Sequence, residues 1–84
     1  MHYVYVIKSI KNKKMYIGCT GDLQARLLQH NTGKVTSTKA DVPFELIYCE
    51  VYKSKTDAFD REKKLKHFGQ GIRRLKERLV NSMK

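Results

Sequence analysis

The sequence predicts a small α+β domain in which helices pack against a mainly antiparallel sheet, with its elements in the order ββαβαα. Short runs rich in aromatic and β-branched residues alternate with polar stretches that carry apolar residues at helical spacing. The 84 residues suit one domain, and 40% hydrophobic residues suffice for one modest core. We therefore expect a single domain over residues 1–84, with an α+β layer arrangement.

The three predicted strands are the most apolar parts of the chain. Residues 2–8 (HYVYVIK) alternate aromatic and β-branched side chains, which is typical of a strand. Residues 9–14 are polar and contain Asn12, which favours a turn, and residues 15–18 follow as a second strand. These two strands therefore form a hairpin. Residues 44–52 (FELIYCEVY) form the longest apolar run and predict the third strand.

The first predicted helix follows the hairpin. Thr20 or Asp22 can cap its N-terminus, and Leu23 and Leu27 recur four residues apart. We expect this helix to end near residues 31–33. Residues 33–43 (GKVTSTKADVP) then form a loop that is rich in hydroxyl groups and contains two lysines.

Two further helices are predicted after the third strand. Ser54 or Thr56 can cap the second helix, which we expect to end near residue 67 because Gly69 and Gly71 follow. The last helix covers residues 72–80 and is amphipathic, with basic residues facing outward. Its inward residues are Ile72, Leu75, Leu79 and Val80.

The charge balance indicates a polyanionic partner. Eighteen Lys and Arg residues against eight Asp and Glu residues leave a net charge of +10. Such a field attracts nucleic acid, although a merely solvated basic surface is the alternative. No apolar run is long enough for a transmembrane helix, and the N-terminus lacks the pattern of a signal peptide. We expect a cytoplasmic protein with no membrane partner. Cys19 and Cys49 lack the spacing of a zinc site.

Glu62 interrupts the apolar face of the second helix. Ala58, Phe59 and Leu65 define that face, and Glu62 lies in the middle of it. An inward carboxylate is costly unless a cation or hydrogen-bond donors meet it. It is either half of a structural ion pair with a Lys or Arg, or a ligand of a divalent metal ion. The spacing alone slightly favours the ion pair.

Two further pairs of polar residues converge on the core. Arg26 and His30 are one helical turn apart and lie at the rim of the core, which is most often a surface or capping contact. Tyr5 and Tyr16 should lie opposite or diagonal on the hairpin, and such a pair is normally core packing with a hydroxyl at the surface. Gly18 follows Tyr16, and its missing side chain would let a ligand backbone approach closely.

Taken together, these residues resemble the GIY-YIG endonuclease superfamily, in the form of a short stand-alone member. Residues 3–5 (YVY) stand where the family has GIY, and residues 16–18 are a literal YIG. Residues 19–34 (CTGDLQARLLQHNTGK) resemble the family's helix with its arginine and, one turn on, its histidine. Residues 58–66 (AFDREKKLK) resemble the later helix with its glutamate. The resemblance covers nearly the whole chain, to about Leu79.

The resemblance implies a metal-dependent phosphodiesterase on a three-stranded antiparallel sheet flanked by helices. Tyr16 would be the general base on the attacking water and Tyr5 would position it. Arg26 would neutralise charge in the transition state, and His30 would assist proton transfer or hold phosphate. Glu62 would bind the single divalent metal, Mg²⁺ or Mn²⁺, with no other cofactor. The resemblance thus favours the metal-ligand interpretation of Glu62.

A tyrosine has an ordinary pKa of about 10 and is a poor base unless nearby cations lower it. We expect Arg26, the metal and local lysines to do so. Two positions depart from the family pattern. Tyr3 replaces the first glycine, and Cys19 stands where DNA-repair members carry a lysine. A non-catalytic nucleic-acid-binding module on the same fold is therefore the alternative function.

The predicted partner is DNA, with RNA left open. No helix resembles a major-groove reader, so contacts to the phosphate backbone should dominate and sequence specificity should be low. The hydroxyl-rich loop supplies the candidate nucleic-acid-binding residues. They are Lys34, Thr36, Ser37 and Lys39, with Thr38 beside them.

Overall fold

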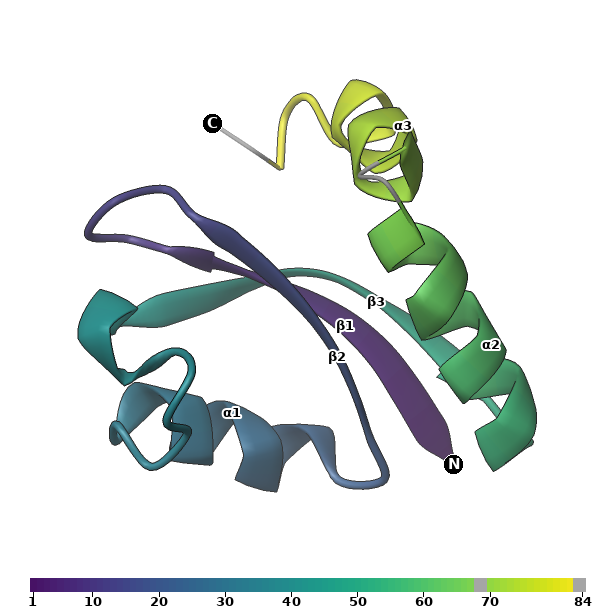
Figure 1. Ribbon diagram of the computed structural model, residues 1–84, viewed down its shortest axis with the longest axis horizontal. Helices are drawn as coiled ribbons and strands as arrows, with labels where there is room; N and C mark the ends of the chain where they lie inside the picture. Colours follow the sequence, from purple (N-terminus) through teal and green to yellow (C-terminus); the bar gives the residue numbers. More distant parts are fainter. Residues whose placement is uncertain (68–69, 83–84) are drawn as a thin grey trace.

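The computed structural model describes residues 1–67 and 70–82 and confirms the predicted α+β order (Figure 1). A three-stranded antiparallel sheet lies between α1 on one side and α2 with α3 on the other. The elements are β1 (His2–Ser9), β2 (Met15–Thr20), α1 (Leu23–Asn31), the 3₁₀ turn η1 (Lys39–Asp41), β3 (Phe44–Tyr52), α2 (Lys55–Lys66) and α3 (Gln70–Arg78). Within residues 1–67 and 70–82 no helix is long and apolar enough to cross a membrane.

Strand β1 is the centre of the sheet, which has the order β2-β1-β3. Tyr5 pairs with Gly18 across the hairpin, and Ile7 pairs with Tyr16. Because Tyr16 precedes Gly18 by two positions, the two tyrosines share a face and lie diagonally, as predicted. Among the described residues, strand β2 pairs with β1 alone, so the YIG segment lies on an edge of the sheet.

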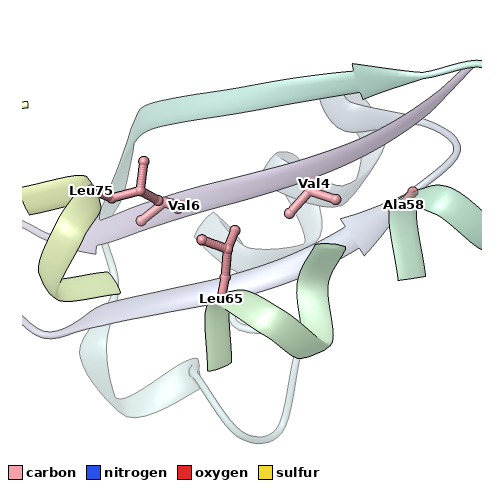
Figure 2. Packing of buried hydrophobic residues seen from close by; sticks show 5 residues of the cluster. All are labelled: Val4, Val6, Ala58, Leu65 and Leu75. Atoms are coloured by element: carbon pink, nitrogen blue, oxygen red, sulfur yellow. The ribbon is translucent and has the colours of Figure 1, made fainter. Parts of the chain in front are cut away.

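The two faces of β1 carry different neighbours. Val4 and Val6 face α2 and α3 and are fully buried there. Figure 2 shows the cluster that they form, whose members are Val4, Val6, Ala58, Leu65 and Leu75. The opposite face carries Tyr5 and Ile7, which pack with Phe44 and with Leu23 and Leu27 of α1. The α1 face is therefore the one that buries polar aromatic groups.

Side-chain caps fix where the helices begin. The Asp22 carboxylate accepts a hydrogen bond of 3.1 Å from the backbone N–H of Ala25, so Asp22 rather than Thr20 caps α1. Ser54 caps α2 by accepting from the N–H of Asp57 at 3.3 Å. Gly33, at φ 73°, follows the end of α1 in the left-handed conformation that glycine adopts without strain.

The structure corrects the predicted bounds of the last helix. Helix α3 ends at Arg78, so Val80 leaves the apolar face and is 57% exposed. Gly71 belongs to the first turn of α3, whereas Gly69 lies outside the described residues. A side chain at position 71 would lie 2.6 Å from the Leu65 Cα. This glycine therefore allows α3 to pack closely on the end of α2, and it does not terminate that helix.

Phe59 is a second correction. It was expected on the apolar face of α2, but it is 43% exposed and lies beneath the Lys55 ammonium group. Ala58 is fully buried in the cluster with Val4 and Val6, and the next residue points about 100° further round the helix. The buried face of α2 is therefore carried by Ala58 and Leu65.

Candidate active site

A cleft of about 520 Å³ runs along the β2 edge of the sheet. Because β2 has no strand on its outer side, side chains from both faces of the sheet meet over it. The lining comes from β1, β2, α1, the loop after α1, the C-terminal half of α2 and the start of α3. It includes all five predicted catalytic residues, namely Tyr5, Tyr16, Arg26, His30 and Glu62.

Tyr5 and His30 form the buried floor of the cleft. Only 2% of Tyr5 and 4% of His30 are exposed, and the Tyr5 hydroxyl lies 2.9 Å from His30 Nε2. The other ring nitrogen, Nδ1, lies 2.9 Å from the Thr38 hydroxyl. Burial lowers the pKa of His30, and the charge of Arg26 lowers it further. A neutral imidazole has one donor and one acceptor nitrogen, so His30 links two hydroxyl groups.

Gly18 makes room for Tyr5. The two residues face each other across the hairpin, and a methyl group on Gly18 would overlap the Tyr5 phenol ring. We expected this glycine to admit a ligand backbone, but the space beside it is filled by the protein's own tyrosine. Gly18 therefore acts by letting the ring of Tyr5 lie flat across β2.

Tyr16 is bound to a residue that the sequence did not single out. Its hydroxyl donates a hydrogen bond to Asp41 Oδ2. That bond raises the pKa of Tyr16, and desolvation and the Asp41 charge act in the same direction. We expected nearby cations to lower this pKa, and the direction is the opposite because a carboxylate is the group in contact. At neutral pH Tyr16 is a neutral phenol.

Glu62 opens onto the cleft and forms an ion pair on its own helix. Its Oε2 atom lies 3.1 Å from Lys66 Nζ, and 20% of its side chain is exposed. Lys66 also lines the cleft, as does Arg26, which bonds Gln29 Oε1 at 3.0 Å. Two cations and one carboxylate therefore border the same space. The ion pair expected from the spacing exists, and it is partly solvated.

Comparison with known proteins identifies the family of this chain. The family model described as the GIY-YIG catalytic domain matches residues 1–70. The chain belongs to the GIY-YIG family. This membership supports an endonuclease-like function for the cleft.

Similar GIY-YIG chains bear the name UPF0213 protein. One from Staphylococcus haemolyticus is 39% identical over 80 residues, covering 92% of this chain and 96% of the relative. One from Staphylococcus aureus is 35% identical over the same shares. The solution NMR structure of a UPF0213 protein from Bacillus halodurans is 34% identical and matches with a TM-score of 0.55. That match covers 95% of this chain and 82% of the other.

Cys19, which replaces the lysine of DNA-repair GIY-YIG members, lies on the Glu62 side of the cleft. Burial raises the pKa of its thiol, and the negative charge of Glu62 raises it further, whereas Lys55 acts in the opposite direction. Position 19 therefore faces the carboxylate. The cations that border the cleft come instead from α1 and α2, as Arg26 and Lys66.

The donor set of the cleft suits a weakly held divalent ion. Among the described residues no three His, Cys, Asp or Glu side chains are grouped to hold a metal. Glu62 is the one carboxylate among the described residues that line the cleft. A single carboxylate fits Mg²⁺, which keeps most of its waters and accepts substrate oxygens as further ligands.

The loop after α1 contributes less to the cleft than predicted. Of the candidate nucleic-acid contacts, Ser37 lines the cleft, whereas Lys34, Thr36 and Lys39 are exposed beside it. Thr38 is 2% exposed and is used by His30. Neither this role of Thr38 nor that of Asp41 is visible in the sequence, because a loop has no periodicity that shows which side chains turn inward.

Proposed function

We propose that this GIY-YIG chain is a metal-dependent endonuclease. It would hydrolyse DNA phosphodiester bonds in the cytoplasm with low sequence specificity, as a single domain over residues 1–84. One observation carries the proposal. Tyr5, Tyr16, Arg26, His30 and Glu62 come from four separate elements and line one cleft beside the edge strand.

Arg26 and Glu62 supply the electrostatic part of the proposed reaction. A phosphodiester gains negative charge as water attacks, and a guanidinium aimed at that charge lowers the barrier. Arg26 serves this purpose from α1. Glu62 would hold Mg²⁺ or Mn²⁺, which, when bound, stabilises charge on the phosphoryl and leaving oxygens. Lys66 would release Glu62 for that role at little cost, because a solvated pair one helical turn apart is weak.

The two tyrosines would position the attacking water and accept its proton. Tyr16 lies at the edge of the cleft and takes a proton from the attacking water as general base. Tyr5 is held by its hydrogen bond to His30, so its hydroxyl can fix the position of the water or of a phosphate oxygen. Neutral His30 can accept or donate a hydrogen bond at Nε2 without placing a charge beside Tyr5.

The charge of the surface supports a nucleic-acid substrate. A net charge of +10 favours the phosphate backbone, and Ser37, which lines the cleft, would contact it together with Lys34, Thr36 and Lys39 of the same loop. DNA is the proposed substrate, and RNA is the comparison that the assay must include. Because these contacts ignore the bases, affinity should fall steeply with salt and vary little with sequence.

The test is a nuclease assay on single-stranded, branched and duplex DNA and on RNA, with Mg²⁺, Mn²⁺ or a chelator. We expect cleavage that needs the metal and is lost in Glu62→Gln, with binding nearly unchanged. Asp60→Asn is the matched control, since it removes one charge from the same helix outside the cleft and should cut normally.

Three results would contradict the proposal. Salt-sensitive binding with no cleavage under any metal would identify the non-catalytic nucleic-acid-binding module instead. A response to salt that is flat would remove nucleic acid as the partner altogether. Cleavage by Glu62→Gln at the wild-type rate would leave Glu62 as half of an ion pair and no more.

A further inference from the structure

The Tyr16 hydroxyl lies between the cleft and a buried carboxylate. Tyr16 lines the cleft, whereas Asp41 is not among its lining residues and is 8% exposed. The phenol proton points to Asp41 Oδ2, since a carboxylate can only accept. The lone pairs of the Tyr16 oxygen are therefore left for a group on the other side, where the attacking water would be.

Asp41 is held firmly behind Tyr16. Asn12 Nδ2 donates to its other carboxylate oxygen at 2.6 Å, and the Ser9 hydroxyl donates to its backbone carbonyl at 2.6 Å. Ser9 is fully buried, and the Asp41 N–H bonds the Thr38 carbonyl at 3.0 Å. Each carboxylate oxygen thus has one fixed donor, and the hairpin and η1 lock the geometry together.

We propose that Asp41 is the terminal proton acceptor of the site, reached through Tyr16, which relays the proton and stays neutral. This inference rests on the proposed hydrolysis. As the water oxygen bonds to phosphorus, its O–H bond breaks and the proton bonds to the Tyr16 oxygen. The phenol's own O–H bond breaks and that proton passes to Asp41 Oδ2. The leaving oxygen departs with its electron pair and takes a proton from bulk water, and Asp41 returns its proton to solvent.

The charges around the pair favour a relay over a free phenolate. A phenolate beside Asp41 would place two negative charges in contact, whereas the relay never carries more than one. The groups that face Asp41 are Tyr16, Asn12 and the more distant Lys14 and Lys11. The bonds from Tyr16 and Asn12 and the charges of the two lysines lower the pKa of Asp41, so it is ionised and able to accept at neutral pH.

A purely structural Asp41, which only ties η1 to the hairpin, makes a different prediction in a swapped pair of residues. In Asp41→Asn alone, one of the two donors, Tyr16 or Asn12, meets an amide NH₂. In Asp41→Asn with Asn12→Asp, the amide oxygen accepts from Tyr16 and its NH₂ donates to the new carboxylate. Every hydrogen bond is then restored, but no carboxylate touches Tyr16.

We expect Asp41→Asn to cut about 10²–10⁴ times more slowly in single turnover, as loss of a general base does. The double variant should regain the thermal midpoint but not the rate. Tyr16 should also titrate at a lower pH in both variants, because the carboxylate that raises its pKa is gone. This is measured by NMR of ¹³C-labelled tyrosine, with Tyr16→Phe to assign the signal, and it needs no cleavage.

Three outcomes would overturn the relay. Recovery of the wild-type rate in the double variant would make Asp41 structural. An unchanged titration of Tyr16 in both variants would show that Asp41 does not hold its proton, whether or not the protein cuts. A wild-type chain that cuts nothing would reject the proposed hydrolysis and the relay with it, while the titration would still report the contact itself.

Discussion

Asp41, which is buried, and Glu50, which is partly buried, lie on opposite faces of the sheet, and both accept hydrogen bonds from tyrosines. Among the described residues, only Glu50 of these two contacts an arginine. Arg61 Nε and a terminal nitrogen donate to the two Glu50 oxygens at 2.8 and 3.0 Å. The donors to Asp41 are the neutral Tyr16 and Asn12. Both sites thus pair a carboxylate with tyrosine, but only the carboxylate of Glu50 is balanced by a bonded cation.

That balance decides what each carboxylate can do. Burial acts to raise the pKa of Glu50, but bonds from Arg61, Tyr48 and Tyr52 outweigh it and lower the pKa to about 2. Glu50 is therefore neutralised and clamps α2 to β3. Asp41 keeps its charge without a guanidinium, and its tyrosine opens onto the cleft. A tyrosine–carboxylate pair thus becomes a candidate for proton transfer when its charge is unpaired and its phenol borders the site.

The largest expected contrast is between the tyrosines themselves. Tyr16→Phe keeps the ring but deletes the hydroxyl that takes the proton, and should slow single-turnover cleavage by about 10²–10⁴-fold. Tyr48→Phe removes the corresponding bond to Glu50 and should leave cleavage unchanged. Equal rates for wild type and Tyr16→Phe would place the chemistry elsewhere in the cleft.

Removing the arginine should affect stability and spare the chemistry. Arg61→Ala leaves Glu50 half-buried without its cation, and we expect the free energy of unfolding to fall by about 2–3 kcal/mol. Urea denaturation measures this change. Arg61→Lys keeps the charge but loses the paired hydrogen bonds, so its free energy of unfolding should lie between those of wild type and Arg61→Ala. A stable Arg61→Ala with impaired cleavage would reverse the assignments of the two clusters.

Acid should weaken the Glu50 cluster, which consists of Glu50, Arg61, Tyr48 and Tyr52, within a defined pH range. The folded pKa of about 2 lies below the ordinary value of 4.5, so the stabilisation is fully present above pH 4.5 and is lost as the pH falls toward 2. The loss is on the order of 3 kcal/mol. In Glu50→Gln the unfolding free energy should change less across that window, which circular dichroism at several acidic pH values can follow. The lowered pKa of Asp41 acts with the same sign and remains in that variant.

The smallest expected effect is at Tyr52. Its hydroxyl donates to Glu50 at 2.7 Å, and Tyr52→Phe deletes one of several bonds to that carboxylate. We expect a loss of about 1 kcal/mol in unfolding free energy with cleavage unchanged. A much larger loss would mean that the tyrosines, and not Arg61, hold the Glu50 charge.

The strands and caps were predictable because their signals are local. The apolar run at residues 44–52 matches β3 to the residue, and Asp22 and Ser54 cap helices as their side chains allow. Val80 and Phe59 were wrongly predicted to be buried. Periodicity gives the direction of a side chain around a helix. It does not give the residue where the helix ends, which decides Val80, or how far each side chain is covered by the sheet, which decides Phe59.

The candidate site was predictable only in part. The five candidate catalytic residues were identified by their resemblance to the family motifs, and the fold brings all five to one cleft. Asp41 and Thr38 could not be found, since their inward positions depend on how residues 33–43 fold back over the hairpin. The sign of the shift in the pKa of Tyr16 depends on that same fold, so counting nearby lysines gave the wrong direction.

Gly18 and Tyr5 have a consequence for how this sequence can change. The ring of Tyr5 occupies the volume that a side chain at Gly18 would need, so the two strands share one space. Alanine at position 18 becomes acceptable only after position 5 has been shortened, and shortening it first removes one of the two hydrogen-bond partners of His30. Each single step is penalised while the double step is sterically allowed. The two positions are therefore epistatic, and a substitution at either one alone is unfavourable.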